Sequence, residues 1–213
     1  VVLARTKEYC SVFHGKMREK IVKKLYRALA AAPVPRGIMS HYMRPVNVAP
    51  RLVSEDFHRG WHLCQLEVLE CTEVPWPNAA IQEKYFVDDC GWPSKDIAYE
   101  LLMTHGVEEN IVYHTDKSYH EMQIRAQFAA CGAPIVGDSM YIPAVMAERS
   151  NPGVNPFGEH GKLHATEEEK ANAEKEWMAQ HGKEPSVAIG LQAYQISWDE
   201  GEYIYEAGSP WWR

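Results

Sequence analysis

The sequence contains neither a long apolar stretch nor a cysteine pattern. No apolar run among its 213 residues reaches the roughly 18 residues that a membrane-spanning helix needs. Its five cysteines are odd in number and include no C-x-x-C pair, which disfavours both a structural zinc site and a disulfide framework. We therefore expect no contact with a membrane, no bound metal, and a reducing compartment.

Several short motifs are also missing. The chain has no initiator methionine and no signal peptide, so we expect any targeting segment to have been removed or to lie upstream of Val1. A G-x-S-x-G motif is absent, which leaves a generic α+β hydrolase as a weak alternative. None of the ten histidines forms a pair with ligand spacing on a predicted helix, which again disfavours a metal site.

Charge is distributed very unevenly along the chain. The net charge is −7, yet residues 1–60 carry 12 Lys and Arg against 4 Asp and Glu. Since a polyanion responds to the local potential rather than to the total charge, this basic segment is compatible with binding to nucleic acid. A solvated basic surface without a ligand is the alternative.

Hydrophobic periodicity and capping residues predict a mixture of helices and strands. Helices are expected at 6–20, capped by Thr6, at 96–104, in the later part of 119–131 and at 166–180. Strands are expected at 21–30, 38–42, 61–71, 109–114, 186–198 and 202–206, and a short strand and turn at 135–141. This pattern predicts an α+β fold with a mixed, largely antiparallel central sheet flanked by helices. We expect one domain over 1–213, with insertions at 72–95 and 142–185.

Three stretches together resemble one enzyme family. They are residues 2–8 (VLARTKE), residues 22–29 (VKKLYRAL), and residues 123–127 (QIRAQ) followed by 132–141 (GAPIVGDSMY). In this order they resemble the RluA-type RNA pseudouridine synthases, whose corresponding blocks read K-x-Y-x-A-x-V and H-Q-I-R-x-H…G-x-P-I-x-G-D-x-x-Y. Residues 189–193 (IGLQA) are a weaker match, and residues 41–45 (HYMRP) are similar to plant and algal organelle members.

The resemblance implies isomerisation of uridine to pseudouridine in structured ribosomal or transfer RNA, with no metal or organic cofactor. The target base must leave its stack and enter a pocket. Tyr26 matches the tyrosine that stacks on the uracil and is a candidate base for the C5 proton. Arg125 matches the arginine that pairs with the catalytic aspartate. We expect the functional ends of Tyr26 and Arg125 to lie within about 10 Å of each other. Gly137 and Asp138 are interpreted as turn residues.

The partner that the resemblance implies is RNA, held by the basic residues near Tyr26. These are Lys16, Arg18, Lys20, Lys23, Lys24 and Arg27. An organelle, either chloroplast or mitochondrion, is the expected location. The cytoplasm and the nucleus remain alternatives, as does membership of a larger ribonucleoprotein assembly.

The chain departs from the family pattern in two places. No H-R-L-D segment occurs, and the register of residues 3–5 places the catalytic aspartate upstream of Val1, so we expect Val1 to begin a strand at the rim of the cleft. Residues 118–122 (SYHEM) replace the T-G-R/K-T-H of the family and introduce an acidic residue. An alternative function is therefore that of an inactive relative that binds RNA or serves as a structural subunit.

Overall fold

The computed structural model describes residues 3–19, 21–45, 51, 53–105, 117–150 and 187–213, and isolated positions within 166–185. The helices are α1 (Lys7–Arg18), α2 (Ala79–Tyr85), α3 (Lys117–Ala130) and α4 (Ile142–Ser150), with a 3₁₀ turn η1 (Asp199–Gly201). The strands are β1 (Lys23–Ala30), β2 (Gly37–Met43), β3 (Val53–Ser54), β4 (His62–Pro75), β5 (Ile97–His105), β6 (Leu191–Trp198) and β7 (Tyr203–Glu206).

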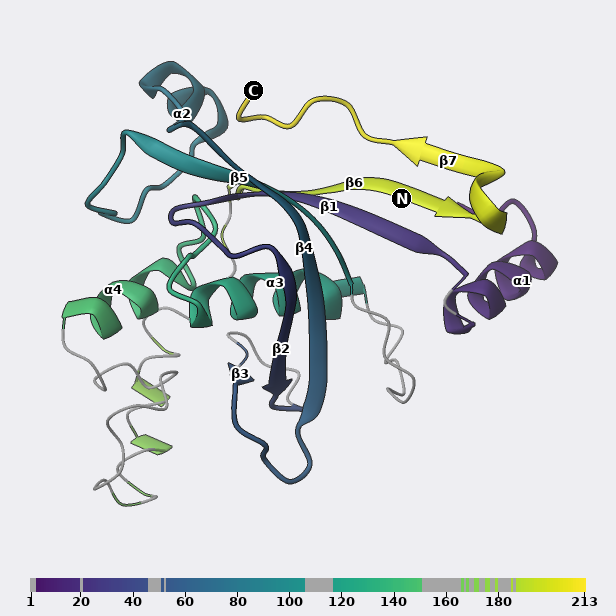
Figure 1. Cartoon of the computed structure of the whole chain (residues 1–213), viewed down its shortest axis with the longest axis horizontal. Helices are drawn as coiled ribbons and strands as arrows, with labels where there is room; N and C mark the ends of the chain where they lie inside the picture. The colour runs from purple at the N-terminus through teal and green to yellow at the C-terminus, as the bar shows by residue number, and fades with distance from the viewer. Residues whose placement is uncertain are drawn as a thin grey trace.

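The strands form one sheet with the order β3-β2-β4-β5-β1-β6-β7 (Figure 1). Every pairing among these described strands is antiparallel, from β2–β3 at one edge to β6–β7 at the other. The prediction of an α+β fold with an antiparallel sheet and flanking helices is confirmed, and these strands contain no parallel pair. Hydrogen bonding places β1 between β5 and β6, so β1 is an inner strand.

Side chains of β1 alternate between two apolar clusters. Tyr26 and Ala28 pack in the cluster that includes Ile124 and Phe128 of α3, whereas Leu29 packs with Trp212 near the C-terminus. Figure 1 shows α3 on one side of the sheet, with α2 and the C-terminal segment on the other. We call these the α3 face and the C-terminal face. Tyr26 therefore lies on the α3 face.

The prediction of a helix at 96–104 is wrong, because these residues form β5. Leu101, Leu102 and Met103 are good helix formers, which explains the error. In the structure Leu101 and Met103 pack in the cluster of the α3 face, while Glu100 contacts Trp212 on the C-terminal face. A central strand buried on both faces contains apolar residues at successive positions, so its period is hard to distinguish from that of a buried helix.

The segment 72–95, expected as an insertion, contributes to the core. β4 continues to Pro75, and Thr72 pairs with Glu100 of β5. Trp76 and Trp92 are buried in the cluster on the C-terminal face. Pro75 does not interrupt the pairing, because it occupies the last position of β4, where a missing amide hydrogen is tolerated.

Other predicted elements have mixed outcomes. The Thr6 hydroxyl accepts a hydrogen bond from the Tyr9 amide at 3.2 Å, which confirms the cap of α1. Of the short strand and turn predicted at 135–141, the turn is confirmed, and the strand is reduced to a single β-bridge between Ile135 and Ala30. The strand at 109–114 lies outside the described residues. Within 166–180 the described helical positions are Glu168, Ala171, Asn172, Lys175, Glu176 and Ala179, all exposed, in agreement with a surface helix.

Candidate active site

Helix α3 is fixed to the sheet by a buried amide network. The Gln127 side chain is fully buried, and its amide nitrogen lies 3.1 Å from Nδ1 of His41 and 3.3 Å from the carbonyl oxygen of Cys64. Gln123 donates to Oε1 of Gln127 at 3.0 Å and to the carbonyl oxygen of Gln65 at 3.2 Å. Burial lowers the pKa of His41, which favours its neutral form. These bonds set both the height and the rotation of α3 over β2 and β4.

Arg125 lies on this helix and forms a buried, bidentate ion pair. Its Nε donates to Oδ2 of Asp138 at 2.8 Å, and its Nη2 donates to Oδ1 at 2.9 Å. Only 4% of the Arg125 side chain and none of the Asp138 side chain is exposed. The remaining nitrogen, Nη1, lies 3.2 Å from the Met122 sulfur. Two parallel hydrogen bonds in a buried setting fix the plane of the guanidinium.

Asp138 therefore does more than the turn role expected for it. The turn itself is as predicted: Oδ1 accepts from the Met140 amide at 3.3 Å, and Gly137 has a φ of +82°, a conformation that favours glycine. The ion pair with Arg125 is the feature that the sequence interpretation missed. The two residues are thirteen positions apart. The only signal in the sequence is that both lie in the stretches that resemble the RluA-type family, residues 123–127 and 132–141.

Tyr141 extends this group of residues toward β3. Its hydroxyl accepts from the Arg51 amide at 2.8 Å, and its ring centroid lies 5.4 Å from Cζ of Arg125. Met43, Val53, Cys64 and Met122 belong to the apolar cluster around it. Arg125 is thus held among Asp138, the Met122 sulfur and the Tyr141 ring, and the segment that leads into β3 is bonded to the same group.

Tyr26 and Arg125 are brought to the same face of the sheet. Tyr26 is 5% exposed and shares its cluster with Ile124, the residue that precedes Arg125 on α3. A separation of about 10 Å between their functional ends stays a prediction. Val1 lies outside the described residues, and so do the side chains of residues 118–121, which belong to the altered segment 118–122 at the start of α3.

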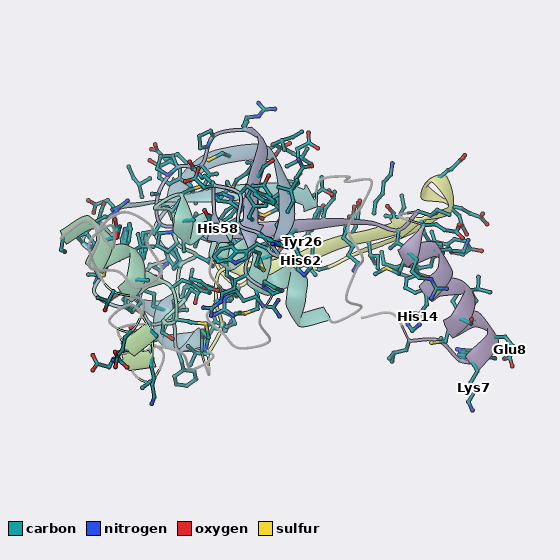
Figure 2. All side chains as sticks on the ribbon, turned by 90° about the horizontal axis from the view of Figure 1, so that it is seen from below. Lys7, Glu8, His14, Tyr26, His58 and His62 are labelled. Atoms are coloured by element: carbon teal, nitrogen blue, oxygen red, sulfur yellow. The ribbon has the colours of Figure 1, made fainter. Side chains whose placement is uncertain are left out.

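The predicted RNA-binding residues do not form one group. Figure 2 shows α1, with its labelled residues, well away from Tyr26. On α1, Lys16 forms an ion pair with Asp199 and Arg18 is exposed. At the start of β1, Lys23 is exposed and Lys24 is half-buried. Lys20 lies outside the described residues.

Arg27 points away from Tyr26, which corrects the expectation that it flanks the same cleft. Its Nη1 donates to Oε1 of Glu100 at 2.9 Å, and its Cζ lies 4.0 Å from the Tyr194 ring centroid. Adjacent residues of a strand point to opposite faces, so Tyr26 and Arg27 cannot share one. A cavity of about 210 Å³ beside Arg27 and Glu100 accordingly opens on the C-terminal face.

Glu100 collects the hydrogen bonds that attach the C-terminal residues to the sheet. Oε2 accepts from the Trp212 indole and from Nε of Arg213, each at 2.9 Å, while Oε1 accepts from Arg27. Burial alone would raise the pKa of Glu100, but the hydrogen bonds from Arg213 and Trp212 and the charges of Arg213 and Arg27 outweigh it, so the pKa is lowered.

Replacing Glu100 with Gln should lower the free energy of unfolding by about 1–3 kcal/mol at neutral pH, because two arginines lose a buried carboxylate. A carboxyl group whose pKa is lower in the folded state stabilises above its unfolded pKa, and this stabilisation is lost as the pH falls. The difference between wild type and Glu100→Gln should therefore shrink below about pH 4.5. Urea unfolding at pH 7 and at pH 4 measures it. A difference independent of pH would contradict the electrostatic explanation.

Among the described residues, no group of three or more His, Cys, Asp and Glu side chains is arranged to hold a metal ion. None of the described helices is long and apolar enough to cross a membrane.

The chain is similar along its whole length to two plant enzymes. It is 62% identical over 216 residues to "RNA pseudouridine synthase 6, chloroplastic" of Arabidopsis thaliana and 55% identical over 215 residues to the protein of the same name from Oryza sativa subsp. japonica. Each alignment covers 100% of this chain and 43% of the relative, so the chain spans less than half the length of these relatives. No family model matches the chain.

Solved structures agree on the fold. Human RNA Pseudouridylate Synthase Domain Containing 1 superposes with a TM-score of 0.50 at 13% identity, covering 97% of this chain and 62% of that protein. Identity this low supports a shared fold and nothing more. Together with the plant relatives, it confirms the resemblance inferred from the sequence: this chain is homologous over its whole length to part of the plant RNA pseudouridine synthases and has the pseudouridine synthase fold.

Proposed function

We propose that this chain forms the catalytic part of a chloroplast RNA pseudouridine synthase that converts uridine to pseudouridine in a structured ribosomal or transfer RNA. The observation that supports the proposal most is the placement of Arg125. Its guanidinium is buried and oriented by Asp138 on the face of the sheet that also contains Tyr26. These are the two residues that the family resemblance assigns to the reaction.

The proposed chemistry divides the work between three groups. A carboxylate from upstream of Val1 in the complete protein begins the cleavage of the glycosidic bond. Arg125 pairs with that carboxylate and keeps it ionised. Asp138 occupies the Nε–Nη2 edge of the guanidinium and thereby fixes the orientation in which Arg125 meets that carboxylate.

Tyr26 contributes an aromatic ring and a hydroxyl group at one position. In this proposal the ring stacks on the flipped uracil, and the hydroxyl accepts the C5 proton after the base has rotated and the C–C bond has formed. Burial in the cluster with Ala28 and Ile124 holds the ring in place. The apolar surroundings also exclude water from the detached base.

The test is conversion by the complete protein. Its incubation with chloroplast ribosomal and transfer RNA transcripts, in the presence of a metal chelator, should produce pseudouridine that nucleoside mass spectrometry detects. Binding without conversion of any of these RNAs would favour the alternative function of an inactive relative. Conversion that stops when the chelator is added would contradict the metal-free chemistry.

A test of the basic residues follows from the positions of Lys23 and Lys24. Changing both to Gln should weaken RNA binding for most sequences and reduce the slope of log K against log salt by about 1.4–1.8, since each phosphate contact contributes about 0.7–0.9. Fluorescence anisotropy at several salt concentrations measures the slope. The matched control is Lys84→Gln with Lys95→Gln, both exposed and located in or after α2. Equal slopes for the two double variants would identify the pair as an ordinary solvated surface.

A further inference from the structure

The connection between β3 and β4, residues 55–61, presents exposed aromatic and basic side chains; we call it the aromatic loop. Phe57 is 71% exposed, and Arg59 is exposed two positions later. The rings of His58 and Trp61 contact each other in a tilted arrangement, with their centroids 4.5 Å apart. A single exposed ring is common on protein surfaces, as Phe86 is here; this loop differs in having three aromatic side chains and an arginine within five residues, a combination that suits a binding role.

Internal bonds hold the aromatic loop in one shape. The Ser54 hydroxyl accepts from the Asp56 amide at 2.9 Å and lies 3.2 Å from Nε2 of His58. The Trp61 amide donates to the carbonyl oxygen of His58 at 3.0 Å, closing a turn in which Gly60 has a φ of +85°. Phe57 is supported on one side by Tyr42, in a T-shaped contact at 5.4 Å between ring centroids. The ring is therefore positioned before any partner binds.

The aromatic loop is connected to the candidate site through β3. The Arg51 backbone is bonded to Tyr141, whose ring lies beside Arg125. Phe57 follows Arg51 by six residues, a span of at most about 20 Å. Nucleotides next to a uridine held near Arg125 would pass within reach of this ring.

We infer that the aromatic loop binds a single-stranded nucleotide of the RNA next to the target uridine, with the base stacked on Phe57 and a phosphate contacted by Arg59. This inference rests on the proposed function for the identity of the RNA. Stacking suits Phe57 because every base has a π-face, and it needs no excess of positive charge. Glu55 and Asp56, both exposed in the same loop, outnumber Arg59, its one Lys or Arg residue. Stacking therefore supplies most of the contact.

Phe57→Ala in the complete protein should weaken binding of a substrate RNA about 10- to 100-fold. The salt slope should stay unchanged, because no phosphate contact is lost, and Phe57→Trp should restore the affinity. Arg59→Gln should instead lower the slope by about one phosphate contact. The matched control is Phe86→Ala, since Phe86 is 74% exposed at the end of α2 on the C-terminal side of the sheet. It should bind RNA as the wild type does.

Abasic substitutions identify the stacked base. One abasic nucleotide near the target should weaken the wild type about 10-fold or more and leave Phe57→Ala nearly unaffected, because the two changes remove the same contact. Equal affinity of Phe57→Ala and wild type would overturn the inference and leave a protein partner as the reason for the exposure. If the wild type converts uridine and Phe57→Ala binds equally well, only the aromatic-loop inference fails. If no RNA is converted, but the abasic nucleotide weakens binding by the wild type and not by Phe57→Ala, only the proposed function fails.

Discussion

Arg125→Met in the complete protein should lower the rate of pseudouridine formation at least about 1000-fold, since the nucleophilic carboxylate loses the charge that keeps it ionised and in place. The same change should lower the free energy of unfolding by about 3–5 kcal/mol, because Asp138 would remain buried without its cation. Methionine fills most of the volume of the arginine stem, which limits the loss of packing. Nucleoside mass spectrometry measures the rate, and urea unfolding measures the stability.

A second variant separates the chemical effect of Arg125→Met from its structural effect. Arg125→Met combined with Asp138→Asn removes both charges, while the asparagine oxygen can still accept from the Met140 amide. The free energy of unfolding should return most of the way to the wild-type value, whereas the rate of pseudouridine formation should stay low. Activity that returns together with stability would show that Arg125 only supports the fold.

Tyr26→Phe should lower kcat about 100- to 10,000-fold with little change in RNA affinity, because the ring remains to stack on the base while the proton acceptor is lost. The ring stays in the apolar cluster of the α3 face, so the free energy of unfolding should change by no more than about 1.5 kcal/mol. Single-turnover conversion at saturating enzyme measures the chemical step apart from RNA binding.

Tyr99→Phe is the matched control for Tyr26→Phe. Tyr99 is a partly buried tyrosine of the neighbouring strand β5 that packs against the same cluster. Its variant should convert uridine at the wild-type rate. Full activity in Tyr26→Phe would remove this hydroxyl from the mechanism and leave Tyr26 as a stacking residue at most.

Local patterns in the sequence were sufficient for several elements. Three of these features depend only on neighbours within a few residues. They are the cap of α1 by Thr6, the alternation of Cys64, Leu66 and Val68 along β4, and the end of α3 before Gly132. Such features follow from backbone geometry and from the contrast between apolar and polar positions. β5 was missed because a strand buried on both faces lacks that contrast.

The sequence by itself determined the family resemblance, the α+β class and the identity of Tyr26 and Arg125 as candidates, since those depend on residue types at fixed spacing. Tertiary structure alone decided which charges meet. Arg125 is paired with Asp138 on the α3 face, and Arg27 is directed to Glu100 on the C-terminal face, one residue away from Tyr26. The physical reason is that an ion pair between segments depends on how α3 and the strands cross in space, and a buried charge is stable only with the partner that this crossing provides.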